Sequence, residues 1–236
     1  MRITIFLLLL IGYLPARSQQ GVKRQTLDAM QKLAERYRSN EGIGFDIQYR
    51  YSMEQTPGLY LDSLKGECKM SGNQYWYQMD NTESIRTNDF VIMLFREDSL
   101  MYLNKPNDVA EMVNPVAMMD SLLNHSGNID CRITEHPGYT SLFMDFKVRS
   151  AYKSLEYQVD RQSGLLLKIV SVVRAEQLGY ETPAYAIVET SFTNYRQGGI
   201  DHKLFKAENY FRKEGNEYVT VAPYSSYRIF LGSTGM

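Results

Sequence analysis

Residues 152–175, YKSLEYQVDRQSGLLLKIVSVVRA, decide the fold class. Hydrophobic and polar side chains alternate along residues 152–160, which is typical of a β-strand with one dry and one wet face. The tetrapeptide RQSG at 161–164 then predicts a four-residue turn. Residues 165–175 predict a second strand that returns beside the first, so we expect an antiparallel hairpin here.

The same pattern of short strands bounded by turn residues recurs along most of the chain. Residues 43–53 are the clearest case, because Phe45, Ile47, Tyr49 and Tyr51 alternate with polar side chains. Helices do not alternate with these strands, which argues against a nucleotide-binding α/β fold and favours an antiparallel meander. Beyond the hairpin we expect strands at 43–53, 59–70, 74–79, 83–86, 90–96, 100–103, 129–135, 140–147, 184–195, 205–212, 217–222 and 227–231.

Two segments have helical rather than strand periodicity. Residues 26–39 carry hydrophobic side chains at three- and four-residue spacing, which predicts an amphipathic helix with one apolar stripe. Residues 108–124 predict a second helix, in which Asn114 and Pro115 have the pattern of a cap and a first-turn proline. Because we find no linker, repeat or low-complexity stretch, we expect residues 19–236 to form a single domain.

The N-terminus has the layout of a secretory signal peptide. Arg2 follows Met1, residues 3–14 are almost entirely hydrophobic, and Ser18 ends a short stretch with small residues. An apolar run of about a dozen residues is too short to span a bilayer comfortably. We therefore expect residues 1–18 to be removed by cleavage near Ser18. The mature protein should be exported to the periplasm, or secreted if the cell has one membrane, and should not span a membrane.

Charge and cysteine content exclude several classes of function. The chain has a net charge of −1, so it lacks the basic footprint of a nucleic-acid-binding protein. Cys68 and Cys131 could form one disulfide in an oxidising compartment, or could be two buried thiols. No set of cysteines and histidines has metal-ligand spacing, so we expect no metal and no cofactor.

Catalytic motifs are also missing from the sequence. The chain has no His-Glu-x-x-His motif, no Gly-x-Ser-x-Gly nucleophile elbow and no glycine-rich phosphate loop. We therefore expect that the protein is not an enzyme.

Several segments resemble the LolA-like superfamily, which includes the carriers of outer-membrane lipoproteins. The closest match is the hairpin at 152–173, where residues 157–160 and 163–165 resemble the family's Asp-x-x-(Ser/Thr)-Gly-Leu pattern. Residues 64–77, 90–106 and 187–195 resemble other strands of the family. In the segment from Gly66 to Tyr77 the carriers have a functional arginine; this chain has none there.

The resemblance implies an α+β fold, a half-open antiparallel β-barrel of about 10–11 strands. It also implies that the N-terminal helix and the mid-chain helix cover the concave face, and that an apolar cavity there accepts acyl chains. The candidate lining residues are the large hydrophobic side chains of the predicted dry faces. They are Phe45, Ile47, Tyr49, Trp76, Phe90, Leu142, Met144, Phe146, Leu155, Tyr157 and Val159.

Two functions remain open at this point. One is a periplasmic carrier or binding module for a lipid, a lipoprotein or another hydrophobic ligand, with the apolar residues lining a cavity. The other is a non-catalytic interaction subunit of an envelope or secretion assembly, in which the same residues fill a solid core. In that case protein partners would dock on a sheet edge, for which residues 224–231 are the candidate strand, although these residues could equally close the barrel.

Overall fold

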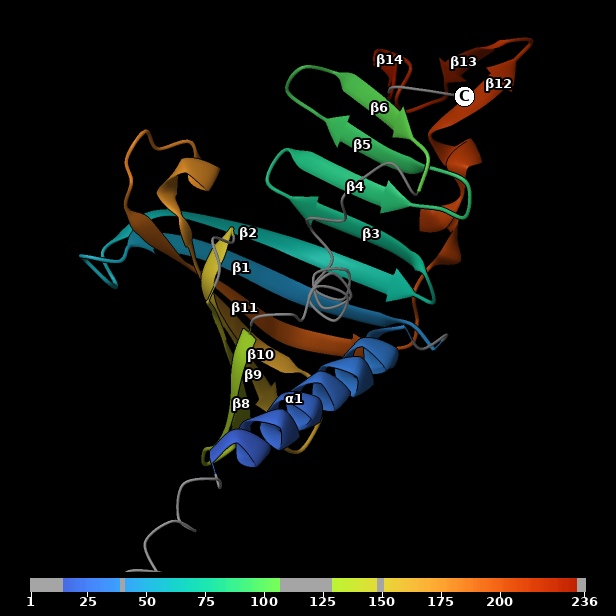
Figure 1. Ribbon diagram of the computed structural model, residues 1–236. Coiled ribbons are helices and arrows are strands. Elements are labelled where there is room, and N and C mark those ends of the chain that lie inside the picture. The colour runs from blue at the N-terminus through green and yellow to red at the C-terminus, as the bar shows by residue number, and fades with distance from the viewer. Residues whose placement is uncertain (1–14, 39–40, 107–128, 148–150, 233–236) are drawn as a thin grey trace, which may run out of the picture.

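The computed structural model describes residues 15–38, 41–106, 129–147 and 151–232 (Figure 1). The apolar run at 3–14 and the predicted helix at 108–124 lie outside these residues. The described part contains helix α1 (Pro15–Tyr37), which starts before the predicted Thr26, and fourteen strands. The strands are β1 (Ile43–Met53), β2 (Tyr60–Ser71), β3 (Gln74–Met79), β4 (Thr82–Arg86), β5 (Val91–Phe95), β6 (Leu100–Asn104), β7 (Ile129–Glu135), β8 (Tyr139–Phe146), β9 (Tyr152–Asp160), β10 (Leu166–Arg174), β11 (Tyr185–Gln197), β12 (Phe211–Glu214), β13 (Glu217–Thr220) and β14 (Arg228–Leu231).

Twelve of these strands form one curved sheet in the order β14-β6-β5-β4-β3-β2-β1-β11-β10-β9-β8-β7. All neighbours are antiparallel except β14, which runs parallel to β6. Within the described residues β14 and β7 are the two edges of the sheet and are not paired with each other. The predicted α+β, half-open class is confirmed, and the sheet is slightly wider than expected.

The β9–β10 hairpin forms as the sequence predicts. Leu166 pairs with Val159, and the Asp160 carboxylate accepts hydrogen bonds from the backbone N–H and the hydroxyl of Ser163. Gly164 has a φ of +66°, a backbone conformation that glycine adopts without strain. The turn therefore sets the register in which the dry faces of both strands point to the same side.

The strand predicted at 205–212 is wrong for most of its length. Two short 3₁₀ turns, His202–Phe205 and Ala207–Asn209, occupy this segment, and only β12 follows as a strand. The Asp201 side chain accepts a hydrogen bond from the Lys203 backbone N–H and so starts the first turn. The turns bring Phe205, Tyr210 and Phe211 into one buried cluster, whereas an extended strand would point Tyr210 away from the other two.

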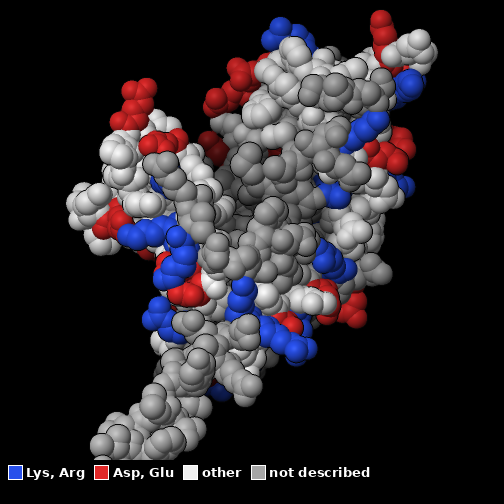
Figure 2. All heavy atoms as spheres, in the orientation of Figure 1, with Lys and Arg blue, Asp and Glu red and all other residues white. Residues whose placement is uncertain are grey.

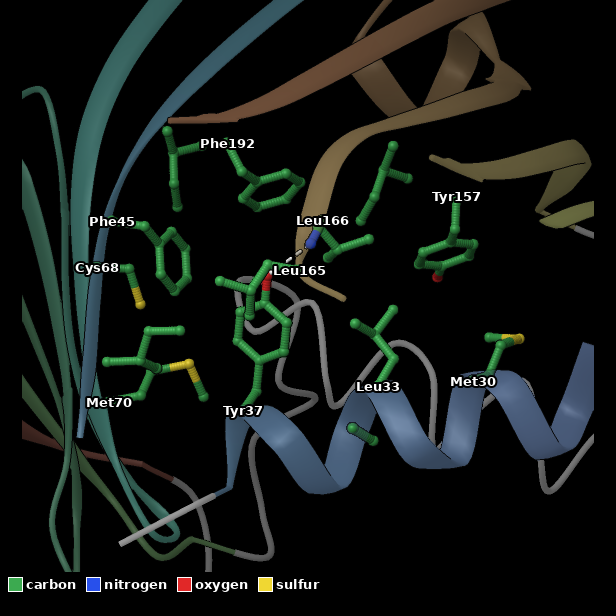
Figure 3. Packing of buried hydrophobic residues seen from close by; sticks show 14 of the residues in the cluster. Met30, Leu33, Tyr37, Phe45, Cys68, Met70, Tyr157, Leu165, Leu166 and Phe192 are labelled. Atoms are coloured by element: carbon green, nitrogen blue, oxygen red, sulfur yellow. Dashed lines mark hydrogen bonds between the residues drawn. The ribbon is translucent and has the colours of Figure 1, made fainter. Parts of the chain in front are cut away.

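Helix α1 packs on the concave face of the sheet, where it buries one apolar stripe (Figures 1 and 3). Met30, Leu33 and Tyr37 are at most 4% exposed and belong to a cluster with side chains from the strands between β3 and β7 in the sheet order. We call this cluster the α1 core. Its strand members include Phe45, Ile47, Cys68, Met70, Tyr75, Tyr77, Leu142, Met144, Leu155, Tyr157, Leu166, Ile169 and Phe192.

A second core lies on the opposite, convex face of strands β3 to β6. Trp76 pairs with Ile85, and Ile85 pairs with Ile92, so these three side chains share one face. Tyr77, the neighbour of Trp76 in the chain, belongs to the α1 core; adjacent strand residues point to opposite faces. Phe205 and Phe211, from the segment that we call the C-terminal cover (residues 200–227), pack against this second core.

A closed ring of hydrogen bonds ties α1 to the sheet inside the α1 core. The backbone N–H of Leu166 donates to the Tyr37 hydroxyl (3.2 Å), and the Tyr195 hydroxyl donates to the Leu166 carbonyl (2.8 Å). The two tyrosine oxygens are 2.5 Å apart. Since the Tyr195 proton is already used, Tyr37 donates to Tyr195. Burial raises the pKa of Tyr37 well above its ordinary value, so the hydroxyl remains protonated.

Replacing Tyr37 by Phe should lower the free energy of unfolding by about 1–3 kcal/mol, because the buried Leu166 N–H loses its acceptor. Urea unfolding followed by near-UV circular dichroism measures the difference. Tyr218→Phe is the matched control, since Tyr218 has ring contacts with Phe90 and Phe211 but no hydroxyl hydrogen bond among the described residues. Equal losses in the two variants would contradict the role of the ring.

Gly66 is required by the close approach of β2 and β3. A Cβ atom placed on it would lie 2.2 Å from the backbone oxygen of Gln78, which cannot move without disturbing the ladder. We expect Gly66→Ala to lower the free energy of unfolding by about 3 kcal/mol. Gly21→Ala in α1 is the control, because nothing lies within 4 Å of its Cβ position; a similar loss there would show that the packing argument is wrong.

Candidate functional site

The candidate site is a groove on the concave face of β5 and β6, beyond the area that α1 covers. It has a volume of about 310 Å³. We call it the concave groove. Its lining residues are Met93, Phe95, Asp98, Leu100, Tyr102 and Asn104. Met93 pairs with Tyr102 and Phe95 pairs with Leu100, so the four apolar side chains come from two neighbouring strands and share one face.

The groove exists because β5 is hydrophobic on both of its faces. Residues 91–95 are VIMLF, five hydrophobic side chains in succession. Ile92 and Leu94 are fully buried in the convex core. Met93 and Phe95 point the other way and are only partly buried. The C-terminal cover can bury one face of β5, and α1 does not extend over the other.

Polar side chains on β4 separate the groove from the α1 core. Ser84 pairs with Tyr77 on one side and with Met93 on the other, so it lies between the two apolar areas on the same face. Its hydroxyl lies 3.4 Å from the Tyr75 hydroxyl. Thr82 and Arg86 flank Ser84 at the same two-residue spacing and therefore also face the concave side. The concave face thus has one filled area and one accessible area.

A row of aromatic rings crosses the groove from β5 to β14. The centroids of Phe95 and Tyr102 are 5.6 Å apart with the rings nearly perpendicular, and Tyr102 stacks on Phe230 at 5.2 Å. Phe230 is 41% exposed. Edge strand β14 therefore extends the apolar floor of the groove by one strand.

Most of the residues that the sequence predicts as cavity lining do face the concave side. Six of them, Phe45, Ile47, Leu142, Met144, Leu155 and Tyr157, are at most 5% exposed in the α1 core. Phe146 and Val159 pack around that core. Tyr49 lies against a smaller cluster formed by Val173, Ala186 and Val188. In the structure these side chains pack against one another and against α1.

Two predicted lining residues, Trp76 and Phe90, do not face the concave side. Both lie on the convex side, in or against the core beneath the C-terminal cover. The Trp76 indole N–H donates to Glu83, whose buried carboxylate also accepts hydrogen bonds from Arg96. Phe90 packs edge-to-face against Phe211, with centroids 5.1 Å apart. Neither side chain faces the concave groove.

Cys68 and Cys131 are free thiols in the structure; Cys68 is buried, whereas Cys131 is only partly buried. Cys68 lies in the α1 core near Tyr37, whereas Cys131 forms a hydrogen bond with Thr26. Thr26 and Tyr37 are roughly 16 Å apart along the helix axis, a separation that a disulfide cannot bridge. Burial raises the pKa of both thiols, which makes them poor nucleophiles.

Other kinds of site find little support in the described part of the chain. It contains no group of three or more His, Cys, Asp and Glu side chains placed to hold a metal ion. A second hollow of about 540 Å³ has mixed polar lining, including Asp89, His202, Lys206 and Glu208. Acidic and basic side chains are interspersed over the face seen in Figure 2. None of the helices in the described residues has the length and hydrophobicity needed to cross a membrane.

No protein-family model and no curated protein matches the sequence. Solved structures with a similar fold include a LolA superfamily protein from Nitrosomonas europaea, at 8% identity and a TM-score of 0.39, covering 78% of this chain and 98% of that one. A DUF1329 family protein from Desulfovibrio piger matches at 8% identity and a TM-score of 0.40, covering 79% and 98%. An uncharacterized conserved protein from Thermus thermophilus matches at 7% identity and a TM-score of 0.49, covering 89% and 98%. One of these structures thus comes from the superfamily that the sequence resembles; all three matches have low identity and concern the fold alone.

Tyr157 provides a test of whether the α1 core is a filled core. Its hydroxyl is fully buried and has no hydrogen-bond partner among the described residues. An unpaired buried hydroxyl is unfavourable, so Tyr157→Phe should raise the free energy of unfolding by about 1 kcal/mol, opposite in sign to Tyr37→Phe. Urea unfolding measures both. A destabilised Tyr157→Phe variant would mean that the hydroxyl has a polar partner in solution and that the area is not dry.

Proposed function

We propose that this chain is an exported periplasmic binding module or carrier for a hydrophobic ligand, which it holds in the concave groove. The observation that carries this proposal is the groove itself. Met93, Phe95, Leu100 and Tyr102 form an accessible apolar floor, whereas α1 fills the neighbouring area of the same face. Accessible apolar surface costs free energy in water, and a contiguous patch of it commonly marks a binding site.

The lining chemistry suits binding better than catalysis. Ligand sites are mostly apolar with a few polar groups that orient the ligand. The concave groove fits this description, since among its six lining residues in the described part of the chain four are hydrophobic or aromatic and two, Asp98 and Asn104, are polar. A volume of about 310 Å³ is at the lower end of the usual range for ligand pockets. The site is therefore suited to one alkyl chain or one small ring system.

The second candidate function, an interaction subunit, is supported by the edge strand. Residues 228–231 of the predicted docking segment pair with β6 inside this chain, so the segment extends the sheet. Phe230 and Leu231 nevertheless remain 41% and 52% exposed on β14. A sheet edge of this kind can accept a strand from another protein. The groove favours the carrier, because its floor is built from three strands of this chain.

Native mass spectrometry of protein purified from the periplasm, followed by organic extraction, tests the proposal first. We expect a lipid or another hydrophobic molecule bound at one equivalent. Recovery from the periplasm with residues 1–18 removed would also confirm export. A clean apo mass, with no uptake of a fluorescent fatty-acid probe, would overturn the carrier and favour the interaction subunit.

A substitution in the groove tests whether the ligand binds there. Met93→Glu places a carboxylate in the apolar floor, and we expect it to weaken binding of a fluorescent fatty-acid probe at least about tenfold, because burying a charge without a partner is unfavourable. Leu167→Glu is the matched control, since Leu167 is 39% exposed and does not line the groove. Equal probe affinities for Met93→Glu and the unmodified protein would show that the ligand binds elsewhere.

A further inference from the structure

The two ends of the groove differ, because the charged lining residue lies at one end. Asp98 lines it at the turn that joins β5 to β6, and Asn104 lines the other end of β6. From Leu100 to Asn104 the strand advances about 13 Å. The apolar side chains of Met93 and Tyr102 lie between these ends. A ligand with an apolar tail and a polar head would therefore place its head near Asp98.

A second charge of opposite sign lies at the same end. Arg228 on β14 pairs with Leu100 in parallel register, and its backbone N–H donates to the Ser99 carbonyl. Its guanidinium lies 6.0 Å from the ring centroid of Phe230, which stacks on Tyr102 in the aromatic row. Arg228 and Asp98 thus flank the start of the groove from two sides.

These two side chains do not neutralise each other. No ion pair of Asp98 or Arg228 occurs within the described ranges, although the neighbouring Arg96 is bound to Glu83 on the convex side. Both side chains are exposed and are available to a ligand that reaches the groove. One carboxylate and one guanidinium at one end are complementary to a headgroup that carries both signs.

We infer that the concave groove selects a single-chain amphiphile with a zwitterionic headgroup, whose cationic group lies against Asp98 and whose anionic group lies against Arg228. The inference rests on the proposed function and specifies its ligand class. The small volume of the groove accommodates one alkyl chain rather than several.

Three detergents with the same dodecyl chain test the headgroup preference. Dodecylphosphocholine carries both charges, dodecyl phosphate carries only the anion, and dodecyltrimethylammonium carries only the cation. Below their critical micelle concentrations, isothermal titration calorimetry should give about a threefold to fivefold higher affinity for dodecylphosphocholine than for either of the others, which is the size expected of exposed charge contacts. Added salt should reduce the difference.

Two variants test which residue contacts each charged group of the ligand. Asp98→Asn should remove the preference over dodecyl phosphate, and Arg228→Gln should remove the preference over dodecyltrimethylammonium. Glu97→Gln is the matched control, because Glu97 is adjacent to Asp98 but accepts a hydrogen bond from Asn81 and does not line the groove. It should leave all three affinities unchanged.

The outcomes separate this inference from the proposed function. Equal affinities for the three detergents, or variants that lower all three affinities alike, would overturn the headgroup preference while the groove remained a binding site. Failure of all three to bind, together with no effect of Met93→Glu on the fatty-acid probe, would overturn the proposed function and this inference with it.

Discussion

The rest of the structure depends on strand β3, where the buried face of the sheet changes from the concave to the convex side. Tyr75 and Tyr77 point to the concave side and belong to the α1 core, whereas Trp76 between them points to the convex core. All three are at most 8% exposed. On the β1 side of this strand the hydrophobic residues are kept dry by α1; on the β4 side they are kept dry by the C-terminal cover. A sheet of twelve strands is wider than helix α1 is long, and this division provides a second covering element.

The division leaves one area without a cover in the described structure. The concave face of β5 and β6 lies past the reach of α1, and the C-terminal cover packs on the opposite face of the same strands. Met93, Phe95 and Tyr102 therefore form an accessible floor next to a core that is otherwise well packed. The rigidity that a binding site needs comes from the convex core beneath it, where Ile92, Leu94 and Met101 are fully buried.

Strand positions could be predicted well from sequence, whereas faces could not always be. Alternation in 43–53 and 152–160 identified both β1 and β9 and their dry sides, because polar residues marked the wet sides. The run Tyr75-Trp76-Tyr77 has no polar member, so its pattern contains no information about which face each ring takes. The groove was missed for the same reason, although five consecutive hydrophobic residues in β5 indicate a strand whose two faces both need cover.

The remaining differences come from contacts between residues far apart in the sequence. The parallel pairing of β14 with β6 joins segments separated by more than half the chain, and local patterns do not specify such a partner. Cys68 lies on β2 and Cys131 on β7, and β7 is six places from β2 in the order of the sheet. Such distances follow from the completed topology, not from spacing in the chain.

The parallel edge strand has a consequence for the order in which the molecule is made. Strands β5 and β6 leave the ribosome early, but their convex face is covered by residues 200–227 and their aromatic row is completed by Phe230, close to the C-terminus. The strands are thus synthesised long before the segments that shield them. A nascent or truncated chain would expose the hydrophobic run VIMLF on two sides, the kind of segment that chaperones bind and that aggregates when it is left uncovered.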